Sequence, residues 1–279
     1  MTKRHQLSAM HRRILGATMA ATLLVSLSAC APTAAGAGAD AASAADKPKS
    51  VSVVASGKLT CAMSGEYRPF NFYDESNKLV GFDVDVCTAV AKELGLEAAP
   101  VTGAFNTLIA GLVGNRYDAI IGSMASTDER KKEVDFSDPY YSTGAQLFVA
   151  KGSSIKDVTG LKDAKVGVAL GTTFEEFAHG LDGVGEVKTY QADIDALRDL
   201  EAGRVDAVIT QGFMGRFLAK SAGLKAEAVG DVLFPDVASI PVSKDNPKLL
   251  SAINAALKTM HDDGTYKKIS MKWFATDIS

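Results

Sequence analysis

The stretch Tyr117–Tyr141 reads YDAIIGSMASTDERKKEVDFSDPYY, and the rest of the chain is organised around it. Its first part, Asp118–Ile121, is a short apolar run closed by Gly122, which predicts a buried strand. The small residues 122–126 come next, and a ligand can approach their backbone amides closely. Thr127 then fits the N-cap of a short helix whose first turn holds two acidic residues.

Arg130 lies in the first turn of that helix, where a cation opposes the positive end of the helix dipole. Local rules are most often broken where function requires it. Free amides, a helix N-terminus and a guanidinium together make a site for a carboxylate, because Arg offers two parallel donors. The alternative is a surface ion pair of Arg130 with Asp128, Glu133 or Asp135, and the stretch alone does not decide between the two.

Further motifs occur in register along the chain. They are EYRPF followed by GFDVD (residues 66–70 and 81–85), FNTLI (105–109), SMASTDERK (123–131), FSDPYY (136–141) and GTT (171–173). In this order and spacing, the chain from about Lys58 to its C-terminus resembles the polar-amino-acid-binding proteins of bacterial ABC importers, the periplasmic solute-binding proteins of family 3. The resemblance implies an α/β fold of two lobes that close on a ligand. Each lobe would be a mostly parallel sheet flanked by helices, and two hinge crossings would join them.

The resemblance also implies a set of ligand-binding residues. Arg130 would hold the α-carboxylate of an amino acid, and Tyr67 and Phe105 would flank the ligand's side chain. The alternative for an aromatic residue is core packing, which we favour for Phe70. The alternative for the GTT turn is a plain N-cap. The full expected set is Tyr67, Phe105, Gly122, Ser123, Ala125, Arg130, Thr172, Thr173 and Gln211.

Gln211 departs from the family pattern. Family members usually place Asp at this strand end, where it pairs with the ligand's α-ammonium. Gln carries no charge and offers both a donor and an acceptor, and a lost charged hydrogen bond costs about 1.5–3 kcal/mol. Either the ligand lacks a simple α-ammonium, or another acid such as Glu66 or Glu175 takes the place of Asp.

Strand and helix patterns alternate along the chain, which favours mostly parallel sheets with helices on both faces. The segment GNRYDAII (114–121) recurs loosely as AGRVDAVI (202–209), so two similar lobes are expected even without the resemblance. The strand ends of both lobes would then face a shared cleft. We expect lobe 1 to comprise residues 51–143 with 238–279, and lobe 2 to comprise residues 144–237.

Residues 1–29 have the pattern of a secretion signal, with basic residues before an apolar run that is too short to span a membrane. The run ends in Leu-Ser-Ala-Cys, which resembles a bacterial lipobox and implies that Cys30 is lipidated. Ordinary signal cleavage nearby and a retained short anchor are the alternatives. Residues 30–50 are rich in Ala, Gly, Ser and Pro and predict a flexible tether. We therefore expect an exported protein, lipid-anchored on the outer face of the cytoplasmic membrane or facing the periplasm.

Charge and cysteine usage exclude several classes of function. Without the four basic residues of the signal, 26 of the 30 basic residues remain against 33 acidic ones, which argues against nucleic acid as a partner. His179 and His261 are the only histidines after the signal and no CxxC occurs, which argues against a zinc site. Cys61 and Cys87 fall within apolar segments, and we expect free thiols there, although an exported pair can form a disulfide.

These observations predict an extracytoplasmic receptor that delivers an amino acid, or a derivative of one, to the permease subunits of an ABC importer. We expect a monomer with no cofactor, no metal and no enzymatic activity. The alternatives are an enzyme on the same fold, similar to the cyclohexadienyl dehydratases, and a solute sensor that does not transport. Cystine, glutamine, basic amino acids and modified amino acids all remain possible ligands. The segments 166–177 and 272–279 resemble cystine-type receptors most.

Overall fold

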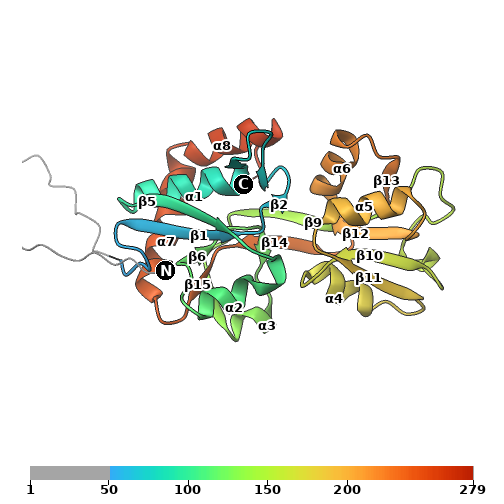
Figure 1. Cartoon of the computed structure of the whole chain (residues 1–279), viewed down its shortest axis with the longest axis horizontal. Coiled ribbons are helices and arrows are strands. Elements are labelled where there is room, and N and C mark those ends of the chain that lie inside the picture. Colours follow the sequence, from blue (N-terminus) through green and yellow to red (C-terminus); the bar gives the residue numbers. More distant parts are fainter. Residues whose placement is uncertain (1–50, 279) are drawn as a thin grey trace, which may run out of the picture. The chain divides into compact units, whose positions relative to one another are not determined.

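The computed structural model describes residues 51–278. The predicted signal (1–29), the predicted tether (30–50) and Cys30 lie outside these residues. The described chain forms two lobes, each with its own sheet and its own helices (Figure 1). This confirms the predicted α/β, two-lobed fold class.

The sheet of lobe 1 has the strand order β5-β1-β6-β15-β8. The first three strands are parallel, and β15 is antiparallel to both of its neighbours. The three strands that follow β1 in the sequence form a separate antiparallel sheet, β2-β3-β4. The bounds are β1 (Lys58–Met63), β2 (Glu66–Tyr67), β3 (Asn71–Tyr73), β4 (Leu79–Val80), β5 (Glu97–Thr102), β6 (Ala119–Ile120), β8 (Val134–Phe136) and β15 (Pro241–Ser243).

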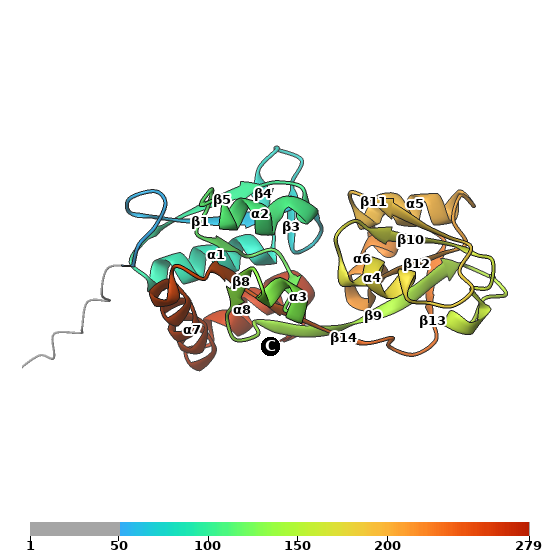
Figure 2. The ribbon, with the colours of Figure 1, turned by 90° about the horizontal axis from the view of Figure 1, so that it is seen from below.

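Helices cover both faces of this sheet, as Figure 2 shows for α1 and α2. Along β1, Cys61 and Met63 pack into the larger core cluster with α1, α7 and α8, whereas Ala62 packs into a second cluster with α2. This alternation follows from the two-residue period of a strand. The helices are α1 (Phe82–Glu93), a 3-10 turn (Phe105–Thr107), α2 (Leu108–Val113), α3 (Asp128–Lys131), α7 (Pro247–Asp262) and α8 (Thr265–Phe274).

The sheet of lobe 2 is built on the parallel strands β11, β10 and β12. The long strand β9 runs antiparallel to β12 and also pairs with β13. The elements of this lobe are a 3-10 turn (Val158–Gly160), β10 (Lys165–Ala169), α4 (Thr173–His179), β11 (Glu186–Tyr190), α5 (Asp193–Glu201), β12 (Ala207–Gln211), α6 (Gly212–Ser221) and β13 (Ala226–Val229).

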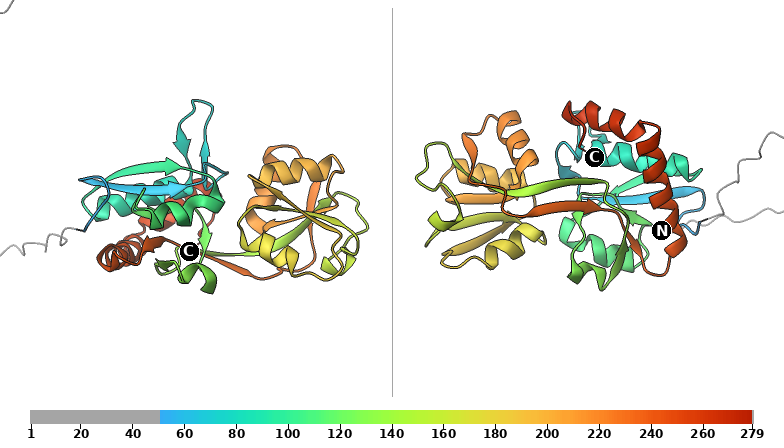
Figure 3. Two further views of the ribbon diagram at one scale, coloured as in Figure 1. Left: turned by 60° about the horizontal axis from the view of Figure 1, so that its bottom comes forward. Right: turned by 180° about the vertical axis from the view of Figure 1, so that it is seen from behind.

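Two antiparallel strands connect the lobes, β9 (Tyr141–Ala150) and β14 (Pro235–Ser239), and they run side by side in Figure 3. In their register, Thr143 lies opposite Asp236 and Tyr141 opposite Ala238. The short strand β7 (Met124–Ala125) pairs with the other edge of β14. The predicted lobe boundaries fall inside β9 and β14, which run continuously from one lobe into the other, so those boundaries stay a prediction.

The expectation of free thiols is wrong, because Cys61 and Cys87 form a disulfide with a Cα–Cα distance of 6.3 Å. Cys61 lies in β1 and Cys87 in α1, and both side chains are fully buried. The apolar surroundings that suggested packed thiols are the interface between that strand and that helix. The sequence does not show that the two apolar segments meet there; the packing of the helix on the sheet brings them together.

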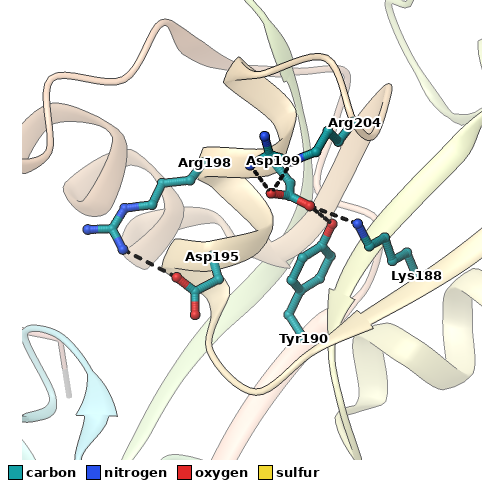
Figure 4. A network of polar contacts seen from close by, with 6 residues as sticks. All are labelled: Lys188, Tyr190, Asp195, Arg198, Asp199 and Arg204. Carbon is teal, nitrogen blue, oxygen red and sulfur yellow. Dashed lines mark hydrogen bonds and ion pairs between the residues drawn. The ribbon is translucent and has the colours of Figure 1, made fainter.

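A polar network on the surface of lobe 2 holds α5 against β11 (Figure 4). The carboxylate of Asp199 in α5 accepts hydrogen bonds from Lys188 Nζ at 2.8 Å, from Tyr190 Oη at 2.7 Å and from Arg204 Nε at 2.7 Å. These donors lower the pKa of Asp199 well below its usual range. The network fixes how α5 lies on the sheet, and therefore where the first residue of α5, Asp193, is placed.

Candidate ligand-binding site

A cavity is lined by residues of both lobes. Eight of the nine residues expected to bind ligand line it: Tyr67, Phe105, Gly122, Ser123, Ala125, Arg130, Thr172 and Thr173. The remaining wall comprises Ser64, Glu66, Ala169, Phe174, Gln191, Ala192, Asp193 and Asp236. The structure thus brings eight of the nine expected residues together, while ligand contact itself stays a prediction.

Arg130 is positioned by backbone atoms from both lobes. Thr127 caps α3 as predicted, because its Oγ1 accepts the amide of Arg130 at 3.2 Å. The guanidinium donates from Nη1 to the carbonyl of Ala125 at 2.7 Å and from Nη2 to the carbonyl of Gly171 at 2.8 Å. Among the described residues, no carboxylate lies within ion-pair distance of it, so the alternative of a surface ion pair is wrong. Burial lowers the pKa of Arg130, and the field of Asp236 partly offsets this effect.

A buried network in lobe 1 fixes the loop at Ser123. Asp83, fully buried at the start of α1, accepts hydrogen bonds from Tyr140 Oη at 2.9 Å and from Ser123 Oγ at 3.1 Å. Asn71 Nδ2 donates to it as well, at 2.6 Å. Burial raises the pKa of Asp83 to about 6, and the three donors oppose that rise.

The amide of Ser123 is not free for a ligand, contrary to expectation. It donates to Tyr140 Oη at 2.8 Å. Ser123 has a left-handed backbone with φ of 59°, an uncommon conformation for a residue with a side chain. The expectation failed because the tyrosine that accepts this bond lies 17 residues further along the chain, in the FSDPYY motif. Ser123 therefore shapes the cavity wall through this network.

The aromatic residues divide as expected between the core and the cavity. Phe70 is 1% exposed and stacks between Tyr67 and Tyr141, with centroid distances of 5.1 Å to each ring. It does not line the cavity, whereas Tyr67 and Phe105 do. The guanidinium carbon of Arg130 lies 5.7 Å from the ring centroid of Phe105, a distance at which a cation still interacts with a ring face.

The GTT turn forms the wall on the side of lobe 2. Thr172 caps α4 by accepting the amide of Glu175 at 3.3 Å, so the N-cap interpretation is right, and Thr172 also lines the cavity. Gly171 has φ of +77°, and a Cβ placed on it would lie 2.7 Å from the Cβ of Asn106 in lobe 1. Only glycine allows the two lobes to approach this closely at that point.

Gln211 does not line the cavity. It is fully buried at the end of β12, where its Nε2 donates to Tyr141 Oη at 3.2 Å. Its Oε1 is buried without a hydrogen-bond partner in the described part of the chain. Glu66 lines the cavity as an exposed residue, whereas Glu175 accepts the amide of Gly171 at 2.6 Å and lies outside the cavity wall.

Sequence reasoning missed two buried carboxylates in the cavity wall, Asp193 and Asp236, which are 5% and 6% exposed. Asp193 accepts a hydrogen bond from Thr210 Oγ1 at 2.6 Å. The pKa of each carboxyl is raised to about 6, chiefly by burial; for Asp236, the charge of Arg130 opposes this rise and the charge of Asp193 contributes to it. An acidic residue inside the otherwise apolar crossing segment was the available signal for Asp236. Asp193 gave none, because acidic residues are common in the first turn of helices.

Within residues 51–278, no group of three or more His, Cys, Asp or Glu side chains is arranged to hold a metal ion. In the same range, no helix is both long enough and apolar enough to cross a membrane.

The fold and the cavity define a two-lobed solute-binding protein. Two paired strands connect its α/β lobes, and residues of both lobes line the cavity. Comparison with known proteins identifies the family. Residues 59–276 match the bacterial extracellular solute-binding proteins, family 3, and the chain belongs to this family. The resemblance drawn from the motifs is thereby confirmed.

Three similar proteins illustrate the range of the family. The L-cystine-binding protein TcyJ of Escherichia coli (strain K12) is 36% identical over 226 residues, which cover 80% of this chain and 85% of TcyJ. An ancestral arginine-binding protein bound to arginine has a similar structure, with a TM-score of 0.75 and 40% identity over 78% of this chain and 98% of that one. The ancestral amino acid-binding protein AncCDT-1, a precursor of cyclohexadienyl dehydratase, has a TM-score of 0.73 and 36% identity, over 78% and 96% of the two chains.

Proposed function

We propose that this chain is an extracytoplasmic receptor that captures an amino acid, or a derivative of one, for an ABC importer. The observation that carries the proposal is the environment of Arg130. Its guanidinium lines the cavity and is held by two carbonyl oxygens, and in the described part of the chain it has no carboxylate partner. A carboxylate of the ligand would supply the missing counter-charge through two parallel hydrogen bonds.

Capture would involve closure of the lobes about β9 and β14. Arg130 belongs to lobe 1 and bonds the carbonyl of Gly171 in lobe 2, so the residue that holds the carboxylate also bridges the lobes. Paired strands with few other connections are typical of hinges. A ligand that contacts both walls favours the closed arrangement by its differential affinity for it. The permease subunits would then bind the surface that the closed lobes form.

The test replaces Arg130 by Gln and measures the affinity for L-arginine, L-cystine, L-histidine and L-glutamine by isothermal titration calorimetry. Loss of a charged hydrogen-bond donor costs about 1.5–3 kcal/mol, so the Kd of the tightest ligand should rise by roughly 10- to 150-fold. Arg116→Gln is the matched control, because it removes an exposed guanidinium outside the cavity and should leave the Kd unchanged. Equal affinities of the Arg130→Gln variant and the unaltered protein would show that Arg130 does not bind the carboxylate.

The two carboxyls with a pKa of about 6 favour one second candidate, an enzyme similar to the cyclohexadienyl dehydratases. That chemistry needs a positioned acid or base with a pKa near the working pH, and Asp193 and Asp236 line the cavity. Turnover of prephenate or arogenate by the unaltered protein, lost in Asp236→Asn, would establish it. Binding of amino acids without turnover of either compound would retain the receptor.

Export and anchoring complete the proposal. We expect Cys30 to carry the lipid and residues 30–50 to tether a monomeric body at the outer face of the membrane. Labelling of the expressed protein with a radioactive fatty acid checks this. The label should be present in the unaltered protein and absent from Cys30→Ser, and an unlabelled protein would contradict the lipid anchor.

A further inference from the structure

Asp236 is a buried carboxylate in the cavity wall that has no hydrogen-bond or ion-pair partner among residues 51–278. It is 6% exposed, yet no donor in the described part of the chain hydrogen-bonds its side chain, and no cation lies within ion-pair distance. Burying such a charge is costly unless it is paired. Arg130 is close enough to favour the ionised form, but it directs its donors at the carbonyls of Ala125 and Gly171.

Asp193 adds a second negative charge to the same cavity. It is hydrogen-bonded to Thr210 and interacts unfavourably with Asp236. Among the described residues, Arg130 is the only cation in the cavity wall, so the site carries an excess of negative charge when both carboxylates are ionised. A ligand that brought only a carboxylate would increase that excess, whereas a ligand with a protonated amine would relieve it.

The strand end at residue 211 cannot supply this function. Gln211 is uncharged, is directed at Tyr141 and does not line the cavity. Asp236 lies two strands away in the same sheet, because β9 separates β12 from β14. Gln211 pairs with Ala145 and Asp236 with Thr143, two residues away along β9, so both residues lie on the same face of the sheet. An acid on the hinge strand is thus available where the strand end offers none.

The pairing of β14 also places Asp236 beside the carboxylate site. One edge of β14 pairs with β9 and the other edge pairs with β7, where Ala238 is the partner of Ala125. The carbonyl of Ala125 accepts a hydrogen bond from Arg130. A cation-binding carboxylate therefore lies beside an anion-binding guanidinium. A solute with an amine and a carboxylate on the same carbon matches this pair of charges.

We propose that Asp236, assisted by Asp193, binds the ammonium group of the ligand from the hinge strand. This inference rests on the proposed function and deepens it, since it restricts the ligand to solutes that carry a protonated amine next to the carboxylate. Because Asp236 belongs to a strand that connects the lobes, capture of the amine acts directly on the hinge.

The experiment compares an amino acid with the 2-hydroxy acid that has the same side chain. The probe is whichever of L-arginine, L-cystine, L-histidine and L-glutamine binds the full chain most tightly by calorimetry. The unaltered protein should bind the amino acid at least about 10-fold more tightly than the hydroxy acid, the equivalent of one charged hydrogen bond. In Asp236→Asn, the Kd of the amino acid should rise by about 10- to 100-fold and that of the hydroxy acid by less than threefold, so the preference disappears.

The control is Asp182→Asn, which removes the same charge from an exposed position outside the cavity and should retain the full preference. A thermal melt confirms that each variant is folded. If Asp236→Asn keeps the preference for the amine, the inference is overturned. If Arg130→Gln loses affinity in that case, the proposed function stands without it. If none of the four amino acids binds the unaltered protein, the proposed function and this inference fail together.

Discussion

Substitution of Gly171 by Ala tests whether the contact between the lobes seen here belongs to the ligand-binding state. Two costs follow from the structure. The φ of +77° disfavours an L-residue by about 1 kcal/mol, and this cost is local to lobe 2. The second cost arises only when the lobes are together, because the new Cβ would lie 2.7 Å from the Cβ and 3.0 Å from the Cα of Asn106.

Carbon atoms pack best at about 3.5–4.0 Å, so the lobes would have to separate by up to ~1 Å at this point. Such a shift lengthens the hydrogen bond from Arg130 Nη2 to the carbonyl of Gly171, which is 2.8 Å long. Forced overpacking costs about 1–3 kcal/mol, and here it is imposed on the closed state alone. Because a ligand that binds the closed state must overcome this cost, its Kd should rise by roughly 5- to 150-fold.

The assay pairs this variant with Gly203→Ala, in which φ is +69° and the new Cβ would have no neighbour within 4 Å in the described part of the chain. Both variants should lose about 1 kcal/mol of unfolding free energy in urea titrations, from the backbone strain alone. Only Gly171→Ala should also lose affinity in calorimetry. If the two variants bind ligand equally tightly, the contact between Gly171 and Asn106 is not part of the ligand-bound state and the reasoning is refuted.

Two further predictions concern stability. Reduction of the Cys61–Cys87 disulfide, which closes a loop of 26 residues, should lower the free energy of unfolding by about 3.5 kcal/mol. Urea titrations with and without dithiothreitol measure this, and a Cys61→Ala, Cys87→Ala variant should not respond to the reductant; identical midpoints for the unaltered protein would contradict the bond. In the ligand-free protein, Asp236→Asn should raise the unfolding free energy at pH 7.5 by about 3 kcal/mol, because the folded-state pKa of Asp236 is raised from 3.8 to about 6. A raised carboxyl pKa contributes stability that is present below pH 3.8 and is lost as the pH rises through about 6, so the advantage of the variant should disappear near pH 4. An advantage that is the same at both pH values would show that ionisation of Asp236 is not its cause.

Features that depend on local sequence pattern could be predicted before the fold was known. The predicted alternation of strands and helices is present, for example in β10, α4, β11 and α5 of lobe 2. Thr127 and Thr172 cap helices as their chemistry requires, because an N-cap bond joins residues only three apart. The order and spacing of the motifs were sufficient to predict the family, and the family implied the two-lobed architecture.

Tertiary structure decided everything that depends on which distant residues meet. Cys61 meets Cys87 because α1 packs on β1, and the amide of Ser123 is engaged because Tyr140 reaches it. Asp236 faces the cavity because β14 pairs with β9 and β7. Burial, and not residue type, raises the pKa of its carboxyl, since a charge loses its hydration only where the packed chain excludes water. The sequence therefore predicted Arg130 as the partner for the ligand's acid group, and only the folded lobes show that the carboxylate of Asp236 lines the same cavity.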